Sequence, residues 1–137
     1  MGPTLDLIGN LSEQQLRFRY AEGKWSAAEV LGHVLDSERI FAYRALRFAR
    51  NDSAPLAGFE QDDYIRGSDF HSRSAASLAQ EYEHVRQATL YLFEFIGSQA
   101  WDRKGQANGV DVSVRALAWI VAGHELHHLT VLNTKYL

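Results

Sequence analysis

The residues of this sequence that could carry chemistry are histidines, and two of them are spaced for one metal ion. His124 and His128 stand four residues apart in the segment Gly123-His124-Glu125-Leu126-His127-His128. On a helix that spacing is a rise of about 6 Å and a rotation of about 40°, so both imidazoles face the same way. The apolar residues around them place both rings on the inward face of the helix, where an unpaired imidazole is unfavourable.

A third histidine, His33, is predicted on the inward face of an earlier helix. It lies between Val30 and Ser37, about two turns after the expected start of that helix. If this helix and the last one are antiparallel neighbours, His33 comes to the level of His124 and His128. Helical bundles hold metal ions between facing helices in this way. We therefore predict that these three histidines bind one divalent ion.

Two other interpretations of these histidines compete with a metal site. Six histidines in 137 residues give roughly 0.25 pairs at this spacing by chance, so the rings could be core residues satisfied by hydrogen bonds. The segment also matches the H-E-x-x-H pattern of zinc metalloproteases. Those enzymes commonly take a third ligand from beyond the motif, but no His, Asp or Glu follows His128. We therefore favour a site built from two helices.

The predicted donor set limits which metal ions can bind. The sequence has no cysteine, so nitrogen and oxygen are the only ligand atoms available. Three histidines with water suit zinc, which we expect first, while nickel, iron(II) and manganese also bind imidazole. His71 and His84 are expected at the surface, and His127 at the flank of its helix.

Acidic residues close to the three histidines have two possible roles. Asp36, Glu38 and Glu125 lie within about a turn of a predicted ligand. One of them could orient a ligand imidazole through a hydrogen bond. Each could equally be a helix charge that is solvated or paired with Arg39 or Arg44.

Helices are expected to position these residues. A capping box at Ser26 starts a helix that reaches about Arg50. Two more helices are predicted over about Ser74–Gly97 and Val114–Tyr136, and one or two helical turns precede Leu11. The apolar face of the second of these long helices is expected to contain Leu78, Tyr82, Val85, Leu92, Phe95 and Ile96.

Two connections between the helices have distinct signals. Asn51–His71 is predicted to be a loop of 21 residues, broken by Pro55 and by glycines. That length lets the chain return along the bundle, so that the next helix runs parallel to the previous one. We place this loop beside the site, with Tyr64 as a candidate contact. Asn108-Gly109 is a tight-turn signal and predicts a short hairpin.

The composition fits one globular domain over residues 1–137. Hydrophobic residues make up 46% and charged residues 23%, which is close to the globular average. The net charge of -3 and the absence of a Lys/Arg cluster argue against nucleic acid and anionic membranes as partners. No apolar run approaches the ~18 residues of a membrane span, and the first residues do not resemble a signal peptide. We therefore expect a cytoplasmic protein.

Several longer motifs are specific when taken together. In chain order they are Lys24-Trp25-Ser26, Glu29–His33, Asp36–Phe41, Pro55–Phe59, Asp63-Tyr64, Ser113–Trp119 and Gly123–His128. They resemble the second helix, the crossover loop and the last helix of the DinB/YfiT-like metalloenzyme family. The resemblance covers about Leu11 to Leu137.

The resemblance implies an all-α four-helix bundle with up-down-down-up topology and a long crossover loop, often in a homodimer. It also implies a three-histidine metal site whose open positions hold water. By position, the ligands of the family fall on His33, His124 and His128. Family members usually have a full first helix where this sequence has only Thr4–Asn10, so we expect a truncated first helix that a partner could complete.

The family resemblance and the predicted site together favour a metal-dependent enzyme with a small-molecule substrate. Some members are thiol-dependent S-transferases that use bacillithiol, mycothiol or glutathione, and one is a maleylpyruvate isomerase. The ion could therefore deliver a low-molecular-weight thiol to a small electrophile. The alternatives are a metallohydrolase that uses metal-bound water, and a non-catalytic, metal-stabilised dimeric binding module.

Overall fold

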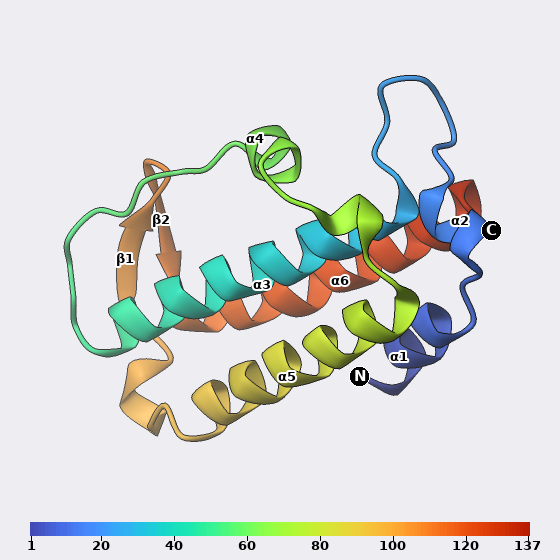
Figure 1. Ribbon diagram of the computed structural model, residues 1–137. Coiled ribbons are helices and arrows are strands. Elements are labelled where there is room, and N and C mark those ends of the chain that lie inside the picture. The colour runs from blue at the N-terminus through green and yellow to red at the C-terminus, as the bar shows by residue number, and fades with distance from the viewer.

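The computed structural model describes residues 1–137, and four helices form its body (Figure 1). They are α1 (Gly2–Gly9), α3 (Ala27–Ala49), α5 (Ala75–Glu94) and α6 (Val114–Lys135). In Figure 1, α3 and α5 run in one direction while α1 and α6 run in the other. This is the predicted up-down-down-up four-helix bundle, with a first helix of only 8 residues.

Short elements connect the four helices. They are α2 (Glu13–Arg17), α4 (Gln61–Arg66), the 3₁₀ turns η1 (Phe70–Ser72) and η2 (Ser98–Ala100), and the strands β1 (Lys104–Ala107) and β2 (Val110–Ser113). The two strands pair antiparallel and are the only sheet in the structure. None of the helices combines the length and the apolar character that crossing a membrane requires.

Serine caps fix where the two histidine-bearing helices begin. At the start of α3, the Ser26 hydroxyl accepts a hydrogen bond from the Glu29 N–H at 3.3 Å, and the Glu29 carboxylate accepts one from the Ser26 N–H at 2.6 Å. At the start of α6, the Ser113 hydroxyl accepts from the Ala116 N–H at 3.1 Å. Both helix starts were predicted from these serines.

The core has two parts. The larger part joins α1, α2, α3, α5 and α6 at the end of the bundle that holds both termini, and the smaller part joins the end of α3 to the hairpin and to the start of α6. Fully burying one large apolar side chain contributes about 1.5–3 kcal/mol. The side chains with almost no exposure include Leu16, Leu35, Phe48, Leu78, Leu117 and Leu132.

The prediction that Phe95 lies in the core is wrong. Phe95 is 70% exposed, although the periodicity of its segment predicts an inward position. The reason is that α5 ends at Glu94, so Phe95 leaves the helical spiral with φ -108° and ψ 17°. Its ring stacks on exposed Tyr91 instead, with centroids 6.1 Å apart.

The long connection after α3 crosses back over the bundle, as its length predicts, but it is not only a loop. It contains α4 and η1, which the sequence analysis missed because one or two turns give too little periodicity to detect. Figure 1 shows this segment returning above α3, so that α5 starts beside the start of α3.

Contacts at both ends hold this crossover segment in place. At one end, the Leu56 N–H donates to the Gln106 carbonyl at 2.9 Å, and the Asn108 N–H donates to the Leu56 carbonyl at 3.0 Å. At the other end, the buried ring of Phe70 packs directly on Gly32 of α3. The segment between these anchors, including α4, is therefore fixed over α3.

The hairpin follows the predicted turn. Asn108 and Gly109 both have positive φ, 52° and 74°. Two central residues in this region match a type I′ turn, which fits the twist of paired strands.

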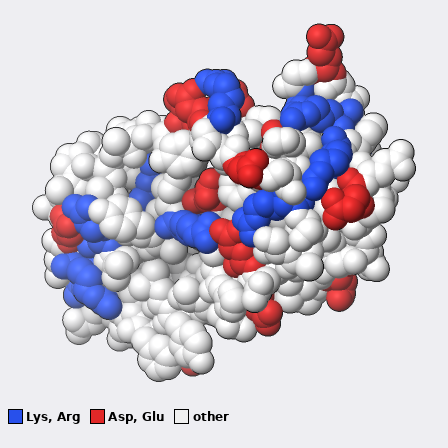
Figure 2. All heavy atoms as spheres, in the orientation of Figure 1, with Lys and Arg blue, Asp and Glu red and all other residues white.

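The charged side chains do not form a patch of one sign on the face shown in Figure 2. Lys and Arg lie interspersed there with Asp and Glu.

Replacement of Gly32 tests the packing of the crossover segment on α3. A methyl group added there would lie 2.2 Å from ring carbons of Phe70. We expect Gly32→Ala to lower the free energy of unfolding by about 1–3 kcal/mol through overpacking. Gly123→Ala is the matched control, because it also precedes a histidine within a helix but meets nothing within 4 Å. Chemical denaturation of both variants measures the difference, and wild-type stability of Gly32→Ala would contradict the packing described.

Candidate metal centre

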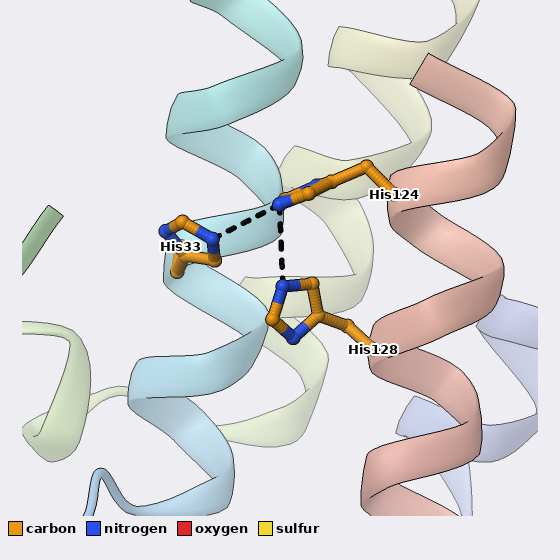
Figure 3. Close-up of side chains that lie close together, drawn as sticks. All are labelled: His33, His124 and His128. Carbon is orange, nitrogen blue, oxygen red and sulfur yellow. Dashed lines mark hydrogen bonds between the residues drawn. The ribbon is translucent and has the colours of Figure 1, made fainter. Parts of the chain in front are cut away.

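The two helices that carry the predicted site lie side by side and antiparallel. His33 projects from α3, and His124 and His128 project from successive turns of α6. Figure 3 shows the three rings pointing toward one another between these helices. The structure therefore brings together all three residues that the sequence singled out.

The same ring nitrogen of each histidine faces the shared point. Nε2 of His33 lies 3.0 Å from Nε2 of His124, and Nε2 of His128 lies 3.2 Å from the same atom (Figure 3). One donor atom from each residue lies within 4.8 Å of the others. A single Nε2 has either one proton or one lone pair, so His124 cannot satisfy both neighbours as a hydrogen-bond partner. A shared cation would satisfy all three nitrogens, so this donor set fits a divalent metal ion.

Burial keeps the three rings neutral. It lowers the pKa of His33 to about 4 and that of His128 to about 3, and mutual repulsion among the histidines adds to the effect. Burial also lowers the pKa of His124. At neutral pH the rings therefore keep the lone pairs that a metal ligand needs.

Aromatic side chains supply the apolar surroundings. The ring of Trp25 lies 5.0 Å from that of His33, and the ring of Phe41 lies 5.6 Å from that of His124, measured between centroids. These rings cover the outer sides of the trio. They reduce the contact of the imidazoles with water, which is the cause of the lowered pKa values.

Of the two roles predicted for the acidic residues near the trio, pairing with an arginine is the one observed for Asp36. The hydroxyl of Ser37 lies 3.4 Å from Nδ1 of His33, one turn further along α3. Nδ1 of His128 is buried and has no hydrogen-bond partner. No acidic side chain hydrogen-bonds to a ring of the trio, and Asp36 lies instead 3.6 Å from Arg39.

Glu38 and Glu125 meet at a buried arginine of α5. Arg86 donates from Nε and Nη2 to the two oxygens of Glu38, at 2.9 and 2.8 Å, and from Nη1 to Oε2 of Glu125, at 2.6 Å. The hydroxyls of Tyr82 and Thr4 donate to the other oxygen of Glu125. All five side chains are buried.

Arg86 was not among the residues that the sequence singled out. His84 is exposed as expected, but Arg86 lies on the buried face of α5. The signal that could have found it is its spacing, four residues after Tyr82 and three before Thr89, which are both buried.

A pocket of about 380 Å³ leads to the trio at His128. Trp25 and Lys24, which precede α3, form one wall, and Asp62 of α4 forms another. A second hollow, of about 630 Å³, is lined by the same three residues and extends the first one along α4. The pocket is large enough for a small molecule and too small for a folded protein or nucleic acid.

Gln61 and Asp62, and not Tyr64, are the crossover residues that line the pocket. The ring of Tyr64 packs against Phe59, with centroids 5.0 Å apart, and does not line the pocket. Asp62 lines the pocket that reaches His128, and its negative charge raises the pKa of His33 against the larger effect of burial. Asp62 forms no ion pair, whereas its neighbour Asp63 pairs with Arg66.

The fold and the inward histidines define a helical-bundle protein with a candidate metal centre in its core. The family model of the DinB superfamily matches residues 3–132, and the chain belongs to that superfamily.

One protein is similar in sequence and one solved structure is similar in fold. The chain is 25% identical over 127 residues to "Putative metal-dependent hydrolase OB0413" of Oceanobacillus iheyensis, covering 90% of this chain and 72% of the relative. It shares its fold with YfiT from Bacillus subtilis, described as "a probable metal-dependent hydrolase with an unusual four-helix bundle topology". The TM-score is 0.76 at 13% identity, over 96% of this chain and 79% of YfiT.

The lowered pKa values predict that the metal-free protein loses stability in acid. His33 takes up a proton near pH 6.5 when unfolded but only near pH 4 when folded, so the unfolded state binds more protons between these values. The stability from this residue is complete above pH 6.5 and is lost as the pH falls toward 4. We expect a slope of about 1.4 kcal/mol per pH unit for each such histidine.

Denaturant titrations in the presence of a chelator, from pH 7 to pH 4.5, measure this slope. His33→Gln should reduce this slope by the contribution of one histidine, while the exposed control His84→Gln should leave it unchanged. A pH-independent free energy of unfolding in the wild-type protein would contradict the assigned burial of neutral histidines.

Proposed function

We propose that this protein is a metal-dependent enzyme in which His33, His124 and His128 hold one divalent ion. The convergence of their Nε2 atoms, at 3.0 and 3.2 Å from the central His124, is the observation that carries the proposal. Three protein ligands are typical of catalytic sites, because they leave positions for water or substrate, whereas structural sites are closed by four. No carboxylate oxygen joins this donor set.

Zinc is the metal we propose first. Three neutral nitrogen donors suit it, and nickel, iron(II) and manganese are accepted by the same ligand type. The printed descriptions of the relative and of YfiT, "Putative metal-dependent hydrolase" and "a probable metal-dependent hydrolase", support a metal ion without specifying which.

We propose hydrolysis of a small ester or amide as the reaction. When bound, the ion would supply Lewis acidity and lower the pKa of a coordinated water. The chain supplies the rest: Trp25 and Phe41 exclude bulk water from the imidazoles, and the 380 Å³ pocket limits the substrate to a small molecule. Thiol transfer to an electrophile, which the family resemblance also implies, would use the same site and is separated by the assay below.

Asp62 is the residue we propose to accept a proton during the reaction. Its carboxylate lines the pocket that leads to His128, and no arginine or lysine neutralises it. A carboxylate in this position can take a proton from a nucleophile as it attacks. The crossover anchors at Leu56 and Phe70 keep α4, and with it Asp62, in place. Formation of a homodimer remains a prediction from the family resemblance.

Loss of any one ligand should abolish stoichiometric metal binding. We expect about one ion per chain in wild-type protein purified without an affinity tag, and far less in His33→Ala, His124→Ala and His128→Ala. His84→Ala is the control, because this histidine is exposed and lies outside the trio. Elemental analysis by mass spectrometry measures the content. An unchanged metal content in the three variants means that the ligands are misassigned.

Hydrolysis and proton transfer are tested with p-nitrophenyl acetate as the probe. We expect turnover that chelation abolishes and that needs no added thiol. Asp62→Asn should lower kcat by about 10²- to 10⁴-fold at unchanged metal content, as for loss of a general base. Asp63→Asn is the matched control, because this neighbour is exposed and paired with Arg66. Turnover that appears only with a low-molecular-weight thiol and an electrophile would reject hydrolysis in favour of transfer.

A further inference from the structure

We propose that Arg86, Glu38 and Glu125 form a clamp that positions the metal centre and places a negative charge behind it. This inference rests on the metal site proposed above. In this proposal three buried residues support the ion, although none of them forms a hydrogen bond with an imidazole of the trio. The clamp is the largest buried polar cluster outside the histidines themselves.

The clamp connects three helices at the level of the trio. Glu38 lies on α3, five residues after His33, and Glu125 directly follows His124 on α6. Arg86 of α5 binds the first carboxylate through two parallel N–H groups and the second through its remaining nitrogen. Charge-assisted, bidentate contacts of this kind are short and directional. They therefore fix the distance between α3 and α6 where the three imidazoles converge.

The clamp also fixes how α6 is rotated about its own axis. Successive residues of a helix are about 100° apart, so Glu125 points away from the direction of His124. Both oxygens of Glu125 are occupied, one by Arg86 and the other by the hydroxyls of Tyr82 and Thr4. While Glu125 is held on the side of α5 and α1, His124 and His128 are turned toward α3.

The charges of the clamp do not cancel. Two carboxylates accept hydrogen bonds from one guanidinium, which leaves one negative charge in a buried cluster. Three neutral imidazoles would leave the positive charge of a bound divalent cation uncompensated. A cation between the imidazoles would therefore be favoured by this cluster through the low-dielectric core.

Metal affinity separates this role from a purely structural one. We expect Glu38→Gln, which keeps the shape of the side chain but removes its charge, to weaken Zn²⁺ binding by about 10- to 100-fold. Arg86→Lys keeps the charge but cannot bridge both carboxylates in the same way, and it should change the absorption spectrum of bound Co²⁺. Glu81→Gln is the matched control, because the Glu81 carboxylate is also paired with arginines, Arg39 and Arg73, but forms no ion pair or hydrogen bond with α6.

The measurements are the Kd for Zn²⁺ by competition with a chromogenic chelator, the Co²⁺ spectrum, and the melting temperature of the metal-free protein. A structural role alone would lower the melting temperature of Glu38→Gln and Arg86→Lys but leave the Kd and the Co²⁺ spectrum at wild-type values, and this result would overturn the inference. Failure of the wild-type protein itself to bind Zn²⁺ would overturn the proposed metal site as well, so the two failures are distinguishable.

Discussion

Antiparallel packing of α3 against α6 brings His33 to the level of His124 and His128, and every other feature of the site depends on that contact. The three imidazoles meet in a poorly hydrated core, which lowers their pKa values and keeps them neutral. The three Nε2 atoms cannot all be satisfied by hydrogen bonds to one another, whereas one cation would accept the lone pair of each. The local chemistry thus follows from the packing of these two helices.

The rest of the bundle supports that contact from two sides. On the inner side, α5 contributes Arg86, which holds a carboxylate of α3 and one of α6. On the outer side, the crossover segment is tied to the hairpin and to Gly32, and it brings Asp62 over the pocket. A rigid interior and an open, charged outer wall are what a small-molecule metalloenzyme requires.

The sequence predicted the long helices, the hairpin turn and the histidine trio, because each has a local signal: a serine cap, an Asn-Gly pair, or imidazoles one turn apart. The family resemblance predicted the topology. Arg86 and Asp62 were missed for physical reasons. The spacing of Arg86 from Tyr82 and Thr89 is compatible with a buried position, but the carboxylates that stabilise an arginine there lie on other helices, far away in the sequence. The helix α4, which carries Asp62, has only 6 residues, too few for a periodic pattern.

A crystal structure of the protein grown with Zn²⁺, with anomalous diffraction measured at the zinc edge, tests the central claim most directly. We predict one anomalous peak between α3 and α6, about 2.0–2.1 Å from Nε2 of each of His33, His124 and His128. Water or a small ligand should occupy the remaining position on the side of the pocket. A peak at any other place, with the three rings hydrogen-bonded to one another, would contradict the account.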